Sequence, residues 1–160
     1  GVANNPGTPV EALASLSRDE EWTVREQVAW NQGASVETLA SLSRDRHKRV
    51  REGVAQNPNT PQAILAGLSR DECEYIRMHV AYNRNTPVEA LDRLSQDEDS
   101  NVRYKAADNP ATSVEALYRL SRDEEYGVCS NVAQNPKWKA VQEPGLLAVA
   151  KLASKWLGIF

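Results

Sequence analysis

The chain has 160 residues, with 22 acidic and 19 basic side chains, and its formal net charge is −3. General nucleic-acid-binding proteins usually carry a strong basic surplus, so this balance argues against that class. The two cysteines do not suggest a disulfide framework, and the chain shows no apolar signal segment at its start. No apolar run reaches the roughly 18 residues of a membrane-spanning helix. We therefore expect a cytoplasmic protein and no membrane partner.

One sequence unit recurs every 26 residues along the chain. The copy at Val54 to His79 reads VAQNPNTPQAILAGLSRDECEYIRMH. Each copy contains an Asn two residues after an Ala, and these are Asn5, Asn31, Asn57, Asn83, Asn109 and Asn135. A fixed period of this length is typical of repeat arrays, in which each unit contacts only its neighbours. Residues 1–136 therefore hold five full repeats and the start of a sixth.

Each unit is predicted to form two helices joined by a turn. The stretch Thr-Pro-x-Glu is typical of a helix start, in which Thr caps free N–H groups, Pro takes the first position and Glu completes a capping box. The caps expected for the first helices are Thr8, Ser35, Thr60, Thr86 and Thr112, the last of them in the stretch Thr112-Ser113-Val114-Glu115. The caps expected for the second helices are Asp19, Asp45, Asp71, Asp97 and Asp123. Asn-Pro then ends the second helix, because a residue before Pro is pushed out of the α region.

The apolar residues of each unit lie three or four positions apart, and no strand-type alternation appears. Each unit therefore has one apolar edge that it cannot bury alone, and stacking on its neighbours buries it. The predicted fold is all-α: a right- or left-handed α-solenoid, or superhelix, of two-helix repeats. Because the chain opens directly on a repeat, we expect an upstream segment or a partner to cover Val2 and Ala3.

The unit VAxNPxTPxEALxxLSRDxxxxVR resembles the leucine-rich repeat variant family over roughly residues 2–136. The resemblance implies an all-helical superhelix that alternates α and 3-10 helices, so the short first helices are expected to be partly 3-10. It also implies a protein-interaction scaffold. One relative holds an iron–sulfur cluster on clustered cysteines, but Cys73 and Cys129 occupy different repeat positions, so that feature is not carried over. We expect no cofactor and no metal.

The polar residues that recur once per unit favour a structural role. Arg25, Arg51, Arg77 and Arg103 share one repeat position, which Cys129 takes in the fifth copy. A recurring Arg and a recurring Asp predict a ladder of ion pairs between neighbouring units. The alternative is a basic stripe for an acidic ligand, and the negative net charge favours the ladder. The recurring Asn is expected to hydrogen-bond within the loop that follows the second helix, which we call the corner.

No catalytic constellation is visible in the sequence. His47 and His79 are the only histidines and lie at different repeat positions, and HExxH, GxSxG, CxxC and Gly-rich phosphate loops are missing. We therefore expect no enzyme. A basic group in the second copy is a candidate binding patch, although a solvated helix face is the favoured interpretation. It consists of Arg44, Arg46, Lys48, Arg49 and Arg51.

The second helices carry large side chains at positions that face away from the predicted core. Aromatic residues, Met and Arg are enriched at binding hot spots. The predicted partner-binding residues are Trp30, Arg49, Tyr75, Met78, Tyr82 and Tyr104. The alternative is that some of them fill the seams between repeats, and for Trp30 and Tyr82 the two interpretations are equally supported.

After the repeats, residues 137–160 are predicted to form a connector, Lys137 to Glu143, and an apolar helix opened by Pro144-Gly145. We expect this helix to cap the open end of the stack. Self-association or a partner is the second interpretation, and an interfacial membrane helix is a weak third, because its polar stripe is narrow.

The function expected from these features is a non-catalytic scaffold that binds a protein or peptide along the second helices. One alternative is a nucleic-acid-binding array that uses the Arg44–Arg51 patch. Another is a purely structural segment of a larger protein.

Overall fold

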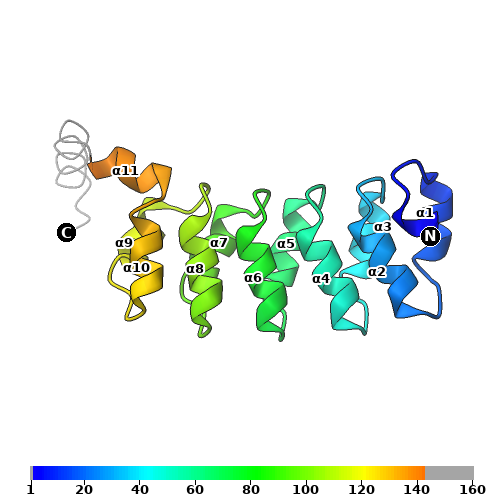
Figure 1. Cartoon of the computed structure of the whole chain (residues 1–160), viewed down its shortest axis with the longest axis horizontal. Coiled ribbons are helices and arrows are strands. Elements are labelled where there is room, and N and C mark those ends of the chain that lie inside the picture. Colours follow the sequence, from blue (N-terminus) through cyan, green and yellow to red (C-terminus); the bar gives the residue numbers. More distant parts are fainter. Residues whose placement is uncertain (1, 143–160) are drawn as a thin grey trace.

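The computed structural model describes residues 2–142 and shows two rows of helices side by side (Figure 1). The first helices of the repeats are α1 (Val10–Leu16), α3 (Val36–Leu42), α5 (Gln62–Leu68), α7 (Val88–Leu94) and α9 (Val114–Leu120). The second helices are α2 (Trp22–Trp30), α4 (Lys48–Gln56), α6 (Glu74–Tyr82), α8 (Ser100–Asp108) and α10 (Tyr126–Val132). A 3-10 turn, η1 (Val2–Asn4), precedes them, and α11 (Pro136–Gln142) follows. The predicted all-helical repeat fold is confirmed, and residues 2–142 contain no strand.

The second helices stack directly on one another along the array: α2 on α4, α4 on α6, α6 on α8, and α8 on α10. Each first helix packs against the second helices beside it. The core residues of the neighbouring helices α5 and α6, Leu65, Ile76, Val80 and Ala81, are fully buried. The small Ala lets consecutive second helices approach closely, and the branched residues fill the space between the two rows. The core is therefore a continuous strip that grows with each added repeat.

The predicted arginine ladder is present. Nε of Arg77 donates to Oδ2 of Asp97 at 2.7 Å, and its second nitrogen donates to Oδ1 at 2.9 Å. The remaining nitrogen donates to the backbone carbonyl of Asp71, 2.9 Å away in its own repeat. Equivalent two-pronged bridges join Arg25 to Asp45, Arg51 to Asp71, and Arg103 to Asp123. Each guanidinium therefore fastens the turn between the two helices of its own repeat to the next repeat.

The ion pairs of the ladder shift the pKa values of their members. The paired hydrogen bonds to Asp97 raise the pKa of Arg77 above its ordinary value. The guanidinium of Arg103 lowers the pKa of Asp123. In the fifth repeat the ladder ends, because Cys129 has replaced the Arg and its Sγ lies 3.0 Å from the Asp123 carbonyl oxygen.

A second ladder, built from the recurring Asn, joins the corners of neighbouring repeats. Nδ2 of Asn83 donates to the carbonyls of Ala55 and Asn57, at 2.9 and 3.0 Å, and Oδ1 accepts from the N–H of Asn85 at 2.9 Å. Asn31, Asn57, Asn109 and Asn135 each bond back across the seam in the same way. The predicted loop role of this Asn is confirmed, and the structure extends it to the contact between repeats.

The predicted caps are correct only in part. Ser35 caps its helix as predicted, and in the fifth repeat the cap is Ser113 in place of the expected Thr112. Both hydroxyls accept from backbone N–H groups three residues on. The Thr residues do not. Thr60 is buried and its hydroxyl donates backwards to the carbonyl of Val54, while Pro61 stands at the cap position without a side-chain bond. Thr8, Thr86 and Thr112 do the same. With the helix starting one residue later than predicted, the expected Glu position also shifts, and no capping box forms at Glu11 or Glu89.

The Asp residues predicted to cap the second helices are not the caps in the structure, because each lies two residues before the cap position. Each accepts the N–H of the residue two positions on, as Asp71 does from Cys73 at 3.0 Å, and that later residue is the cap. The Asp therefore holds the turn before the helix and keeps its oxygens in position for the arginine. The same turn bond is made by Asp19, Asp45, Asp97 and Asp123.

The first helices are α-helices of seven residues, which differs from the expected partly 3-10 element. The 3-10 character lies in the turn that follows, where Arg70 donates to Gly67 and Asp71 donates to Leu68 across three residues. This tighter turn satisfies carbonyls that a helix end leaves free.

The predicted connector after the fifth repeat is helical. Pro136 opens α11, which fits its missing N–H, and the side chain of Trp138 packs on a cluster formed by the last repeat. That cluster consists of Ala107, Leu117, Leu120, Val128 and Val132. Trp138 thus covers part of the apolar end of the stack. The apolar helix predicted after Pro144 lies outside the described residues.

Candidate functional site

The outward face of the second helices presents large aromatic side chains to solvent. The exposed fractions are 49% for Trp30, 56% for Tyr75, 60% for Tyr82 and 39% for Tyr104. The buried residues of the same helices point to the other side, so the predicted division between core and outer face is correct for these four. Exposed aromatic side chains of this kind mark interaction surfaces more often than isolated aliphatic ones do.

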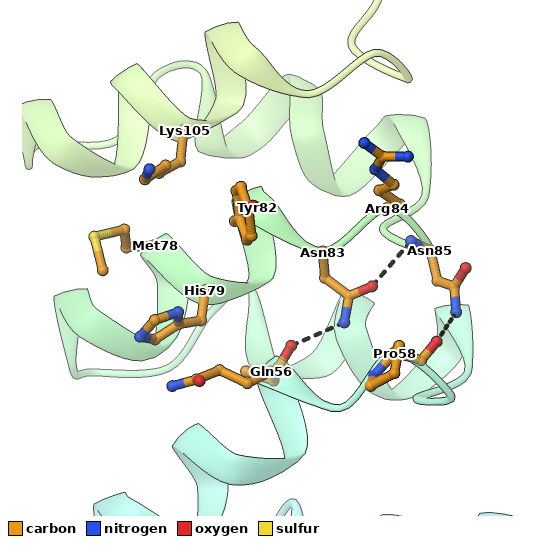
Figure 2. Close-up of a pocket in the computed structure, with 10 residues that line it drawn as sticks. Gln56, Pro58, Met78, His79, Tyr82, Asn83, Arg84, Asn85 and Lys105 are labelled. Atoms are coloured by element: carbon orange, nitrogen blue, oxygen red, sulfur yellow. Dashed lines mark hydrogen bonds between the residues drawn. The ribbon is translucent and has the colours of Figure 1, made fainter. Parts of the chain in front are cut away.

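A groove of about 600 Å³ crosses this face over α4, α6 and α8 (Figure 2). Its lining residues are Ala55, Gln56, Pro58, Met78, His79, Tyr82, Asn83, Arg84, Asn85 and Lys105. Two of the predicted residues, Met78 and Tyr82, line it directly. Tyr104 adjoins it through Lys105, whose ammonium lies 5.1 Å from the ring centre of Tyr82 and 5.5 Å from that of Tyr104. Figure 2 shows Tyr82 standing between Lys105 and the corner residues.

The other predicted residues lie around this groove or away from it. Tyr75 lines a small hollow that it shares with Met78. Arg49 is exposed and pairs with Glu52 at 3.1 Å. Trp30 lies apart from the groove against Gly53, where an added Cβ would come within 2.8 Å of the indole. Trp30 therefore fills the seam between α2 and α4, as one of the two interpretations expects, and is also half exposed, while a role in binding stays a prediction.

Polar residues that the sequence analysis did not select complete the site. Oε1 of Glu52 lies 3.3 Å from Nε2 of His79 and accepts from Gln56 at 3.2 Å. Lys105, His79 and Gly53 occupy one repeat position, which holds Gln27 in the first copy. Every copy has a different residue at this position, so a comparison of the copies would have marked His79 and Lys105 as candidate site residues. The contact of Lys105 with Tyr82, in contrast, depends on how the repeats stack.

His79 titrates below its ordinary range in the folded protein. Burial lowers its pKa, because desolvation disfavours the imidazolium, and Lys105 adds to this effect, while Glu52 opposes it. The unfolded chain takes up this proton near the ordinary pKa of about 6.5, and the folded chain takes it up only at lower pH. The contribution of neutral His79 to stability is therefore present above about pH 6.5 and is lost as the pH falls below it.

The variant His79→Gln should accordingly lose less stability than the original protein when the pH is lowered from about 7.5 to 5.5. Gln27 already occupies this position in the first repeat, so the variant is expected to fold. Urea unfolding at the two pH values, followed by circular dichroism, measures the difference. The same loss in both proteins would mean that His79 titrates alike in the folded and unfolded chains.

The basic patch predicted from Arg44 to Arg51 is smaller in the structure than in the sequence. Arg51 is a ladder residue bound to Asp71, and Arg49 pairs with Glu52. The repeated arginines of the other copies are likewise bound to aspartates, so they form no stripe for phosphates. Within residues 2–142, no group of His, Cys, Asp and Glu side chains is arranged to hold a metal ion, and no helix is long and apolar enough to cross a membrane.

Comparisons with known proteins agree with this architecture. The family model described as leucine rich repeat variant matches residues 49–72 and 76–99. A solved structure described as "a leucine-rich repeat variant with a novel repetitive protein structural motif" matches with a TM-score of 0.65 and 28% sequence identity. The match covers 89% of the present chain and 58% of the solved chain. The chain therefore spans little more than half the length of that protein. No curated protein matches.

Proposed function

We infer that this protein, an array of leucine-rich repeat variant repeats, is a non-catalytic scaffold that binds another protein along the outer face of its second helices. One observation carries this proposal: exposed aromatic side chains gather on α6 and α8 beside a groove of about 600 Å³. Folding leaves Tyr75, Tyr82 and Tyr104 between 39% and 60% exposed, although the same helices bury their Ile, Val and Ala residues, so a partner would gain by covering these tyrosines.

The ladders support a binding role for this face. The recurring Arg and Asn bind residues of the neighbouring repeat and fix one repeat against the next. The residues that differ between copies, such as Tyr82 and Lys105, lie on the outer face. A rigid frame that presents variable side chains loses little conformational entropy on binding, which favours affinity.

Site-specific photo-crosslinking tests this proposal. A photoreactive phenylalanine derivative is placed at Tyr75 in one variant and at Tyr118 in another, and each is irradiated in cells of the native source. Tyr118 is the matched control, because it is an exposed tyrosine on the first helix α9. We expect a discrete crosslinked protein from position 75 and none from position 118. Crosslinks of equal yield at both positions, or at 118 alone, would contradict binding by the second helices.

A further inference from the structure

The groove is positively charged although the protein as a whole is acidic. Its lining contains two permanent cations, Arg84 and Lys105, whereas the chain has a net charge of −3. One carboxylate, Glu52, lies behind the lining residues His79 and Gln56 and is engaged by both of them. Within the described residues neither cation lies within salt-bridge distance of an acidic side chain, in contrast to the arginines of the ladder. Charge of one sign in the lining of a concave site favours a ligand of the opposite sign.

Lys105 is held in place without using its hydrogen-bonding capacity. Its ammonium lies over the rings of Tyr82 and Tyr104, at 5.1 and 5.5 Å from their centres. A cation–π contact orients the ammonium but leaves its N–H groups free, since no acceptor lies within hydrogen-bond distance in the described part of the chain. The ammonium is therefore ready to bind a carboxylate that enters beside Tyr82.

The rest of the groove offers an apolar surface and a rigid wall. Ala55, Pro58, Met78 and the ring of Tyr82 contribute apolar atoms. The side of the groove formed by Pro58, Asn83 and Asn85 is held by hydrogen bonds (Figure 2). Both ends of the Asn83 amide are bonded, and Nδ2 of Asn85 donates to the Pro58 carbonyl. Such a site is formed before the ligand arrives, which reduces the entropy lost on binding.

We propose that this groove binds an extended acidic peptide segment of a partner protein. A carboxylate of the segment pairs with Lys105, a neighbouring apolar side chain packs on Met78 and Tyr82, and a second carboxylate reaches Arg84. The proposal rests on the scaffold function and specifies its ligand. A nucleic acid fits less well, because its binding needs many phosphate contacts and the groove offers only two permanent cations on a chain of net charge −3.

Selection from a displayed library of random 12-residue peptides tests the ligand class. The enriched peptides are expected to combine Asp or Glu with a large apolar residue. Residues of other repeats supply substitutions that the fold already accepts at the same positions: Lys105→Gln as at Gln27, Arg84→Gln as at Gln32, and Tyr82→Gln as at Gln56. We expect Lys105→Gln to weaken binding of the enriched peptides about tenfold, as the loss of a charge-assisted hydrogen bond does. Tyr126→Ser, matched to Ser100, should leave their binding unchanged, because Tyr126 is an exposed tyrosine on α10 that does not line the groove.

Each contrary result has a distinct meaning. Enriched peptides that are neutral or basic, or that bind Lys105→Gln as well as the original protein, overturn the proposal. So does a selection that enriches no peptide over a Tyr82→Gln/Lys105→Gln double variant. Peptides that are lost with Tyr126→Ser but kept with Tyr82→Gln also overturn it, yet they leave the scaffold function standing on another part of the face. The scaffold function itself is tested separately, by comparing the crosslinks from Tyr75 with those from Tyr118.

Discussion

Replacing Arg77 with alanine should lower the free energy of unfolding by about 3 kcal/mol, the cost typical of breaking a buried ion pair. The side chains of Arg77 and Asp97 are only 11% and 9% exposed. Removing the guanidinium leaves the Asp97 carboxylate without its two donors and the Asp71 carbonyl without its one. The control is Arg18→Ala, at an exposed position after the first helix, for which we expect a change within about 0.5 kcal/mol.

The shape of the transition gives a second readout for Arg77. The Arg77–Asp97 pair joins the third repeat to the fourth, so its loss weakens the coupling between the two halves of the array. Urea unfolding followed by circular dichroism should therefore show a broader transition as well as an earlier one. Replacing both partners, as Arg77→Met with Asp97→Leu, should recover much of the loss, because no charge then stays buried alone. Equal small effects for Arg77→Ala and Arg18→Ala would show that the pair contributes little.

Features that repeat with the period of the chain were predictable from the sequence. The ladder is one example, because a recurring Arg and a recurring Asp must meet once per seam if the units stack in register. The two-helix repeat follows from apolar spacing in the same way. In such cases the array itself supplies the long-range information, since each repeat has the same neighbours as the next.

The helix caps were harder to predict, because a hydroxyl has partners on both sides. Thr60 lies one residue before Pro61, close to the free N–H groups of α5 and equally close to the free carbonyl of Val54. The sequence pattern of a helix start predicts that the hydroxyl accepts from the N–H groups of α5. In the folded protein the backbone at Pro61 is extended, with φ −63° and ψ 150°, and the hydroxyl meets the carbonyl instead. Local pattern alone does not distinguish these two geometries.

The groove depends on contacts between residues far apart in the sequence. Lys105 reaches Tyr82 only because α8 stacks on α6, and His79 reaches Glu52 only because α6 stacks on α4. The sequence identified the aromatic residues by type and by helical position. It did not reveal which of them a neighbouring repeat would complete, so Trp30 was grouped with Tyr82 although it lies against Gly53 in another seam.

The second large effect is expected at the corner, where Asn83→Ala should lower the free energy of unfolding by about 3 kcal/mol. Asn83 is buried, and its amide makes three hydrogen bonds at once. The carbonyl of Ala55 lies in the last turn of α4 and has no partner within its helix, so the alanine variant leaves it unsatisfied. Each buried polar group left without a partner costs about 1–3 kcal/mol.

Asn85→Ala is the matched control for this prediction, because Asn85 is also a corner Asn that bonds across the seam to the Pro58 carbonyl. It is exposed, however, and water replaces the lost bonds, so its effect should stay below about 1 kcal/mol. Asn83→Asp should be at least as harmful as Asn83→Ala, since a carboxylate oxygen would then face the two carbonyl oxygens that the amide now serves. Thermal unfolding of the three variants at pH 7 ranks them. If Asn83→Asp proves as stable as the original protein, the inter-repeat hydrogen bonds of the asparagine ladder contribute nothing to the stack, and only its shape matters.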